Sequence, residues 1–560
     1  MGRGPTSGGG IAVASLSDFR KVLDPQVRKA ALKVFLDKIQ EIPKLTPERE
    51  ISVEALRESV KRFHGTKVPL SYFPGSVVNS PCADKFGYMT PAGVRSATKL
   101  AFNLGTQTVL GQLGTAMGNP AAAAGPDSNI PAGYTYFGQF VDHDVTFDIS
   151  SSLDTPTNAT SINNMRSPSL ELDSLYGKGP ALDAFLYNFP SSGPPSAIRM
   201  QLGSNRPSGP GGPGGPGGGG GMQVQKDFDV PRVINPLNPA LSTNTAIIGD
   251  PRNDENLIVS QFHLAMLKFH NEVVDSLVSV ASPGDIFTEA KRIVTHHYQW
   301  AVVHDFLKRI CGNAAVTAAL GSVVAAPNSP FSMPVEFAVG AYRFGHSQIR
   351  NQYWLSAAQI NASLKDVFDF IRNPQIPVLS NWVVDMNAFF QTGIPVAIFN
   401  MAKKIDTVLA AGLNTLPGFP PLMASLAIRN LRRGLALGLP SGQGVAGHFG
   451  IPALTPAQIT GGLPADQAAA LNASGGLLLG KTPLWYYCLR EGAVLQGGNR
   501  LGPVGGRIVA ETFVRMLKRD PNSFLNAPGG FTPFLPTLPS TPAGQFTVAD
   551  IVHFAGVTMP

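Results

Sequence analysis

The sequence predicts a mainly α-helical protein with long irregular connections and very little β-structure. Three observations lead to this class. Apolar residues recur every three or four positions in several long windows, as on helices that pack along one face. Windows of alternating apolar and polar residues are rare. The 560 residues include 60 glycines and 48 prolines, enough to separate the helices by many loops.

The elements follow in order along the chain. The expected structure is disorder over residues 1–12, amphipathic helices within 16–64, and loops with small helices over 65–135. The most regular apolar spacing lies at 257–280 and 287–311, where it predicts two long helices. Further helices are expected at 356–372, 396–412, 421–437, 465–472 and 505–518. The Gly/Pro-rich tract 206–221 is low in complexity and is expected to be a flexible surface loop.

Composition excludes several classes of protein. The net charge of +7 is spread along the chain without a block of like charges, so nucleic-acid binding is not expected. Three widely separated cysteines support neither a disulfide framework nor a zinc site. No apolar run reaches the ~18 residues of a membrane span, and the first 20 residues lack the apolar core of a secretion signal. The expectation is a soluble protein.

The stretch YFGQFVDHDVTFD, residues 136–148, places many polar groups in an apolar segment. On a helix, Gln139 and His143 share one face, Asp142 lies on a neighbouring face, and Asp144 points elsewhere. A histidine in an apolar pocket can act as a general base near neutral pH. Taken alone, the stretch is more typical of an amphipathic helix whose histidine is exposed or a satisfied core group.

Four further windows carry polar residues in apolar surroundings. Each has an ordinary interpretation: a helix cap, a core histidine beside a surface arginine, a basic helix end, or an acidic surface turn. The oxygen-bearing residues of the last window also alternate as in a calcium loop. The residues are Arg252 and Glu255 in GDPRNDEN, Arg343 and His346 in AYRFGHSQI, Asn430 and Arg433 in AIRNLRRGLALGLPSGQG, and Ser167, Ser169, Glu171 and Asp173 in RSPSLELDSLYG.

Together and in this order, the five windows resemble the animal-type haem peroxidases of the peroxidase–cyclooxygenase superfamily, and the match looks closest to the bacterial branch. The resemblance covers roughly residues 85–560, including LGPVGGRIVAE (501–511) and FTVADIVHFAGV near the end. It implies one large helical catalytic domain over 85–560, preceded by an extension, 1–84, that is disordered and then helical.

The resemblance implies roles around a haem b group. His143 would be the distal base, and Gln139 would hydrogen-bond a water or halide in the same pocket. His346 would be the proximal iron ligand, and Asn430 would accept the proton of its other ring nitrogen. Arg252 would stabilise the negative charge that develops as the peroxide O–O bond breaks.

Other residues match the family's contacts to the haem edge. Arg343 and Arg433 match residues that pair with haem propionates. Asp142 and Glu255 match carboxylates that form ester bonds to haem methyl groups. Asn256 stands where myeloperoxidase has a methionine that forms a sulfonium link, so this third link should be absent. Bromide, iodide, thiocyanate or small aromatic donors are therefore expected rather than chloride.

The resemblance also implies a structural calcium ion. Asp144 matches a ligand, and the loop would add Ser167, Ser169, Glu171 and Asp173, of which Ser167 and Glu171 are conservative departures from the family. The ion would tie this loop to the distal helix and hold His143 in place.

The implied function is a peroxidase that reduces hydrogen peroxide through a ferryl intermediate and then oxidises a small anionic or aromatic donor. The protein is expected to be a monomer, secreted or periplasmic, with neither a nucleic-acid partner nor a membrane span. A fatty-acid dioxygenase is an alternative, but such enzymes have a tyrosine three residues before the proximal histidine. Here Arg343 occupies that position, and Tyr342 on a helix would point about 100° away.

Two other classes remain as alternatives. A non-catalytic adhesion protein could use the same scaffold, although the distal and proximal residues are all present. A helical metal-oxidase bundle could use the histidines of the long helices, although none belongs to a Glu-x-x-His pair. These histidines are His263, His270, His296, His297 and His304.

Overall fold

The computed structural model describes most of the chain from residue 85 onward. The described ranges are 85–119, 126–148, 153, 155–205, 227–233, 245–280, 285–356, 360–369, 377–416 and 424–557. All of them belong to one compact unit, Leu56–Pro560. The predictions for residues 1–84 and for the tract 206–221 lie outside the described residues.

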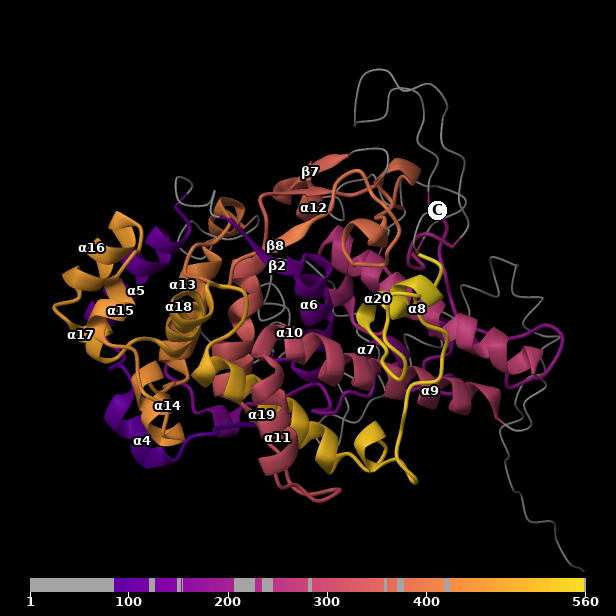
Figure 1. Ribbon diagram of the computed structural model, residues 1–560, viewed down its shortest axis with the longest axis horizontal. Coiled ribbons are helices and arrows are strands. Elements are labelled where there is room, and N and C mark those ends of the chain that lie inside the picture. The colour runs from indigo at the N-terminus through magenta and orange to yellow at the C-terminus, as the bar shows by residue number, and fades with distance from the viewer. Residues whose placement is uncertain are drawn as a thin grey trace, which may run out of the picture. The chain divides into compact units, whose positions relative to one another are not determined.

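Helices dominate the described chain, as the sequence predicts (Figure 1). The α-helices are α4 (Ala92–Thr98), α5 (Leu104–Met117), α6 (Gly133–Val145), α7 (Asp173–Tyr176), α8 (Leu257–Ser279), α9 (Ile286–Ala301), α10 (Leu307–Cys311), α11 (Asn313–Ser322), α12 (Leu364–Asp369), α13 (Leu426–Ala436), α14 (Gly442–Phe449), α15 (Pro456–Thr460), α16 (Ala465–Ala473), α17 (Leu477–Gly480), α18 (Leu484–Gln496), α19 (Pro503–Arg519) and α20 (Val548–Phe554). The 3₁₀ and π segments are η3 (Ala159–Ser161), η4 (Ala184–Leu186), η6 (Pro251–Asp254), η7 (Val302–Phe306), η8 (Glu336–Gly340), η9 (Ala341–Gln348), η11 (Ser380–Trp382), η12 (Met386–Ala388), η13 (Ala411–Asn414) and η15 (Phe524–Asn526).

The β-structure is limited to short pairs. Within the described ranges the strands are β1 (Phe86–Gly87), β2 (Asp127–Pro131), β3 (Tyr187–Asn188), β4 (Arg199–Met200), β5 (Met333–Pro334), β6 (Gln352–Trp354), β7 (Asn361–Ser363) and β8 (Met401–Lys403). They pair two by two: β1 with β5 in parallel, and β2 with β8, β3 with β4 and β6 with β7 antiparallel. No larger sheet forms in the described chain.

The long amphipathic patterns are confirmed as helices. The window 257–280 is α8, and 287–311 is α9 and α10 joined by the π turn η7. The windows 421–437, 465–472 and 505–518 contain α13, α16 and α19.

Two of the weaker predictions need correction. The helix expected at 396–412 is wrong, because β8 pairs with β2 and the side chain of Asp406 accepts the backbone N–H of Val408 (2.8 Å), which forms a local turn. The helix expected at 356–372 is reduced to α12, since β7 occupies the preceding residues and 357–359 and 370–372 lie outside the described chain.

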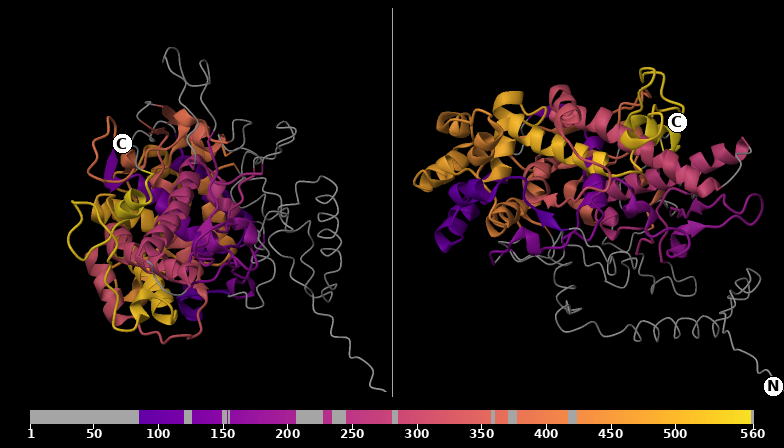
Figure 2. Two further views of the ribbon diagram at one scale, coloured as in Figure 1. Left: turned by 90° about the vertical axis from the view of Figure 1, so that its right-hand side faces the viewer. Right: turned by 90° about the horizontal axis from the view of Figure 1, so that it is seen from below.

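Helix α6 lies at the centre of the described chain, with α8 and α9 on one side and α13 and α18 on the other (Figure 1). The right-hand view in Figure 2 shows α8 and α9 at the opposite end from α14–α18. The first residue of α6, Gly133, contacts the Phe389–Phe390 segment so closely that an added Cβ would lie 2.4 Å from the Phe390 ring. Further along the helix, Phe137 and Phe140 pack edge-on against Phe262 of α8. These contacts bury α6 and fix which of its faces meets the site.

None of the described helices is both long enough and apolar enough to cross a membrane.

Candidate functional site

The two histidines singled out in the sequence line one cavity. His143 comes from α6 and His346 from η9, and the cavity holds about 850 Å³ of empty space counted with its opening to solvent. We call it the histidine cavity. Its described lining is Thr135, Tyr136, Gly138, Gln139, Asp142, His143, Glu255, Asn256, Tyr342, Arg343, Phe344, Gly345, His346, Ile349, Phe368, Leu413, Leu416 and Leu426.

The ring of His143 is buried, with 1% of its side chain exposed. Its Nδ1 lies 2.8 Å from Oδ1 of Asn253, and its Nε2 lies 3.7 Å from Oε1 of Glu255. Burial and, after it, Arg252 lower the pKa of His143, and the net value is about 4 although Asp250 and Asp142 act in the opposite direction. His143 is therefore neutral at pH 7 and able to accept a proton.

Polar groups surround His143 on the cavity side. Gln139 donates a hydrogen bond to Glu255 and accepts one from Asn256 (3.2 Å). Asp142 accepts from the Thr146 hydroxyl (2.9 Å) and lies 3.6 Å from a guanidinium nitrogen of Arg343. Both carboxylates that the sequence pattern places at a haem edge, Asp142 and Glu255, therefore line this cavity and are buried.

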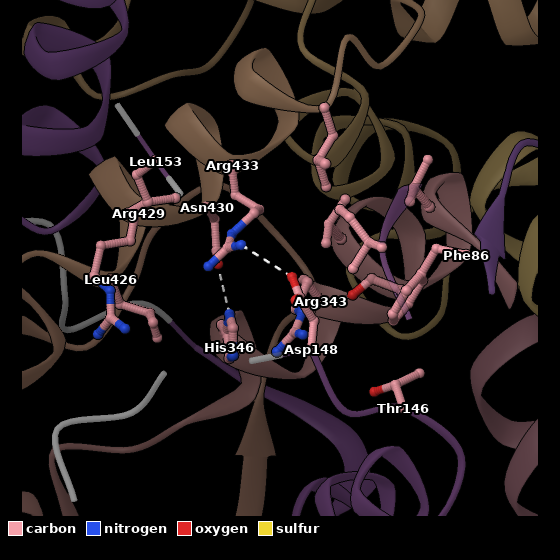
Figure 3. A pocket seen from close by; sticks show the side chains of 15 residues that line it. Phe86, Thr146, Asp148, Leu153, Arg343, His346, Leu426, Arg429, Asn430 and Arg433 are labelled. Atoms are coloured by element: carbon pink, nitrogen blue, oxygen red, sulfur yellow. Dashed lines mark hydrogen bonds and ion pairs between the residues drawn. The ribbon is translucent and has the colours of Figure 1, made fainter. Parts of the chain in front are cut away.

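His346 lies against Asn430 of α13, the pair that the resemblance implies, but the amide has the opposite orientation. Its Nδ2, rather than its Oδ1, lies 2.7 Å from Nδ1 of His346 (Figure 3). In this orientation the amide donates to Nδ1 and leaves the ring proton on Nε2. Metal binding through Nε2 requires a half-turn of the amide, which exchanges two ends of nearly equal size. Burial, followed by Arg343 and Arg429, lowers the pKa of His346 to about 3.

A second cavity of about 690 Å³ adjoins the first and shares Arg343, His346 and Leu426 with it. Arg429 and Arg433 of α13 also line it, so we call it the arginine cavity (Figure 3). Burial, followed by repulsion from Arg433 and Arg343, lowers the pKa of Arg429 to about 10. Three guanidinium groups that face one space would be stabilised by anionic groups bound there.

Two residues of the arginine cavity were missed in the sequence. Arg429 lies one turn before Arg433 on α13, so helical spacing alone could have added it to the set. Asp148, which had no assigned role, lies 3.2 Å from a guanidinium nitrogen of Arg433. No local sequence pattern predicts this pair, because Asp148 follows the end of α6 and Arg433 lies 285 residues later.

Arg252 is placed differently from the expectation. It is not among the described residues that line either cavity. Its guanidinium pairs with Asp250 and donates to the carbonyls of His143 (2.8 Å) and Thr146 (2.8 Å). The carbonyls at the end of a helix lack partners within the helix, and a nearby cation suits them. Arg252 thus holds the end of α6 in place and does not reach into the cavity beside His143.

Asp250 accepts hydrogen bonds from both Arg252 and Arg166 and has no exposed surface. Burial alone would raise its pKa, but the two arginines hold the pKa well below its usual range. Asp250→Asn should lower the free energy of unfolding at pH 7 by about 3–5 kcal/mol, because it leaves two buried cations without their carboxylate. Denaturant titration measures this loss.

The pH dependence of that loss has a definite sign. A carboxyl whose folded-state pKa is depressed stabilises the fold above its unfolded pKa, near 3.8, and this contribution disappears as the pH falls below that value. The difference between wild type and Asp250→Asn should therefore shrink in acid. Asp275→Asn is the matched control, since Asp275 pairs with Arg199 at the surface and such pairs contribute about 0–1 kcal/mol. Equal losses from the two substitutions would contradict the assignment.

The acidic loop lies behind α6. Asp144 accepts from the backbone N–H of Leu172 (3.2 Å) and from the Ser174 hydroxyl (3.0 Å). Asp173 lies 3.4 Å from a nitrogen of Arg166. Burial first, then Asp173, raises the pKa of both Asp144 and Glu171. A cation would relieve this crowding of carboxyl groups.

The other members of the predicted calcium set lie nearby. Ser167 hydrogen-bonds Glu171, and Ser169 is half-buried. Across the described ranges, however, no group of three His, Cys, Asp or Glu residues is arranged as a ready metal site. The acidic loop lies against the end of α6, as predicted. The carboxylates of both segments face protein donors.

The histidines of the long helices have ordinary partners. His270 meets the Tyr176 hydroxyl (3.0 Å) and the carbonyl of Ile198 (3.2 Å), and His297 meets the carbonyl of Ile293 (2.7 Å). A histidine metal centre on these helices finds no support in the described chain.

Tyr342 differs from expectation, because it lines the histidine cavity together with Arg343 instead of pointing away. Its hydroxyl donates to the carbonyl of Gly138 (3.1 Å). The segment is the 3₁₀ turn η9 and not an α-helix, which changes the angle between neighbouring side chains.

Comparison with known proteins identifies the family of the chain. The family model "Animal haem peroxidase" matches residues 218–527, more than half of the chain. A peroxidase-like protein of Margaritifera margaritifera is 34% identical over 131 residues, which is 21% of this chain and 16% of that protein. A dual oxidase of Drosophila melanogaster is 23% identical over 227 residues, 38% of this chain and 14% of that protein. The matched segments thus span less than a fifth of either relative.

Solved structures share the fold. Peroxidase A of Dictyostelium discoideum superposes with a TM-score of 0.51 at 15% identity, over 76% of this chain and 85% of that chain. A fatty acid alpha-dioxygenase of Oryza sativa superposes with a TM-score of 0.51 at 14% identity, over 74% of each chain. At such identities the likeness concerns the fold alone.

Proposed function

The chain belongs to the animal haem peroxidase family, and on this premise we propose that it is a haem-dependent peroxidase that uses hydrogen peroxide to oxidise a small anionic or aromatic donor. One observation carries the proposal. His143 and His346, from elements about 200 residues apart in sequence, line the same cavity together with Gln139 and Glu255.

The residues present fit a haem group. The histidine cavity offers one imidazole as an iron ligand, His346, and an apolar wall that includes Leu413 and Leu416. The adjoining arginine cavity offers Arg343 and Arg433 to two propionate carboxylates, with Arg429 beside them. Asn430 would hold the His346 ring once its amide is turned.

When bound, haem supplies the redox chemistry that takes two electrons from a donor to peroxide. The chain's own residues handle protons. His143 is neutral, and its Nε2 lies on the side of Glu255, so it can accept a proton from peroxide and return it to the leaving oxygen. With a halide donor the balance is X⁻ + H₂O₂ + H⁺ → HOX + H₂O. Gln139 lines the same cavity and would orient a water or anion there.

Arg252 would act through His143. It holds the carbonyl of His143 at the end of α6, so its proposed part is to position the base. The charge stabilisation predicted for Arg252 would require its guanidinium to leave Asp250 and the two carbonyls.

The direct test is a haem titration of the purified chain followed by a peroxide assay. We expect about one haem per chain with a Soret band, and peroxide-dependent oxidation of bromide, iodide, thiocyanate or phenols in preference to chloride. Absence of haem binding by the purified chain would contradict the proposal. Haem uptake without peroxide turnover would favour the non-catalytic scaffold.

The preference for donors other than chloride rests on Asn256. Its amide lines the histidine cavity and donates to Gln139 (3.2 Å), and an amide cannot form a sulfonium bond.

Asp142 and Glu255 can form ester links to haem, since both carboxylates line the cavity. We expect acid–acetone extraction to leave haem on the peroxide-treated protein. Haem that extracts freely from this protein, as it would from an Asp142→Ala/Glu255→Ala control, would rule the esters out.

Calcium is proposed for the acidic loop because Asp144, Glu171 and Asp173 crowd one another behind α6. Removing the ion with a chelator should destabilise the fold by about 2.7 kcal/mol relative to calcium at 100 times its dissociation constant. Thermal unfolding with and without added calcium measures the shift, and Asp144→Asn should abolish it. An unchanged midpoint after metal analysis has shown complete calcium removal would exclude a structural ion.

A fatty-acid dioxygenase is the second candidate, and the place of Tyr342 in the histidine cavity favours it. Such an enzyme would consume oxygen with a long-chain fatty acid and lose this activity in Tyr342→Phe. Oxygen uptake without a peroxide requirement would move the assignment to this class.

A further inference from the structure

Asn253 bridges two buried histidines. Its Oδ1 lies 2.8 Å from Nδ1 of His143, and its Nδ2 lies 3.1 Å from Nδ1 of His263 on α8. The exposed fractions of Asn253, His143 and His263 are 0%, 1% and 0%. The row His143–Asn253–His263 is therefore closed to solvent and connects the distal helix to α8.

The direction of the amide decides which nitrogen of His143 carries the proton. A carbonyl oxygen only accepts, so Oδ1 facing His143 requires the proton on Nδ1. A neutral imidazole has one N–H, so Nε2, on the side of Glu255 and the cavity, then carries no proton. With the amide reversed, Nδ2 would donate to His143 and place the ring proton on Nε2, where it could no longer accept one.

The other end of the Asn253 amide faces His263. Asn253 presents Nδ2 to His263, so Nδ1 of His263 must be the acceptor and its Nε2 must carry the proton. That Nε2 is buried and has no hydrogen-bond partner among the described residues. The backbone N–H of Asn253 donates to the carbonyl of Asp250 (3.0 Å), which anchors the bridging residue in η6.

We propose that Asn253 is a positioning residue that keeps Nε2 of His143 unprotonated toward the cavity, and that His263 sets the direction of its amide. The consequence for peroxide chemistry rests on the proposed function. The tautomer of His143 is a property of the folded chain and can be measured without haem.

Histidine tautomers distinguish the two directions. The chain has 10 histidines, and solid-state NMR of the full chain labelled with [¹⁵N]histidine separates Nδ1–H from Nε2–H rings. His143→Gln identifies the signal of His143 by its loss. We expect His143 to be an Nδ1–H ring and His263 an Nε2–H ring. An Nε2–H ring at His143 in the wild-type chain would overturn the proposal.

Three substitutions test the two parts of the row. Asn253→Leu removes both hydrogen bonds at similar volume and should give His143 a mixture of tautomers. His263→Leu removes only the acceptor for Nδ2 and should also give a mixture, because the amide can then reverse. Asn253→Asp offers oxygen at both ends, so His143 should remain an Nδ1–H ring, and adding His263→Leu to this variant should change nothing at His143.

His270→Leu is the matched control. It removes another fully buried imidazole of α8, whose partners are Tyr176 and Ile198, and should leave the His143 signal unchanged. A His143 signal unaltered by Asn253→Leu would remove Asn253 from its role. A His143 signal unaltered by His263→Leu would remove His263 from setting the direction.

In the haem-loaded protein, the same tautomer mixture should slow the reaction with peroxide by about tenfold and weaken cyanide binding similarly, while KM for the donor stays unchanged. Hydrogen cyanide also leaves its proton on a distal base, so its optical titration is a readout separate from turnover. Absence of haem uptake would defeat the proposed function and leave the NMR result standing. If the tautomers change as expected in the variants but their peroxide rates stay at the wild-type value, the His143–Asn253–His263 row does not control proton transfer by His143.

Discussion

His143→Ala should slow the reaction of the haem-loaded protein with hydrogen peroxide by about 100- to 10,000-fold while haem stays bound. The substitution removes the neutral imidazole that lines the histidine cavity and leaves His346 in place. Stopped-flow spectroscopy of the Soret band measures the bimolecular rate directly. The exposed His448→Ala is the control for loss of an imidazole and should react at the wild-type rate.

The rate of reaction with peroxide should also depend on pH in a definite direction. Burial lowers the pKa of His143 to about 4, so the ring is neutral above that pH and charged below it. Only the neutral ring accepts a proton. The wild-type rate should therefore hold from pH 8 to pH 5 and fall as the pH drops through about 4. A rate that falls near pH 6.5, or a wild-type rate in His143→Ala, would assign the proton transfer to another group.

His346→Ala should lower the affinity for haem more than about 100-fold, because losing even the hydrogen-bond partner of a metal ligand costs about 10- to 100-fold. The remaining cavity would still offer its apolar wall and its arginines, so a weak, spectrally altered complex is expected. Haem titration followed at the Soret band measures the loss, and added imidazole should restore part of the native spectrum.

Asn430→Leu is a milder change than His346→Ala and should cause a smaller loss of haem affinity. It removes the 2.7 Å contact to Nδ1 of His346 while leaving the ring in place, so its loss of affinity should fall in the 10- to 100-fold range. Native haem affinity in His346→Ala would show that another residue binds the iron.

The fold class and the long helices were predictable because their signal is local. Helices α8, α9 and α19 each carry an apolar face at helical spacing, and this spacing needs no knowledge of their partners. The window 396–412 has a similar composition, yet β8 forms there. Its partner β2 lies about 270 residues earlier, and pairing over such a separation leaves no trace within a short window.

The site was predictable as a set of positions but not as a set of orientations. The spacing of Gln139 and His143 placed both in one cavity, as the α-helix requires. The family resemblance placed Arg252 beside them, and it could not foresee that Asp250 and two carbonyls hold the guanidinium elsewhere. Asn253 carried no signal, since its part depends on α6 and α8 meeting the turn η6 from different directions.

The contact between Arg166 and Asp250 bears on how the chain tolerates changes of length. It joins residues 84 apart in sequence, and the Gly/Pro-rich tract 206–221 lies within the loop that it closes. The entropy of closing a loop rises only with the logarithm of its length, so deleting those 16 residues changes the closure free energy by about 0.2 kcal/mol. Evolution can therefore lengthen or shorten this tract at almost no cost in stability, while the buried carboxylate that closes the loop stays fixed.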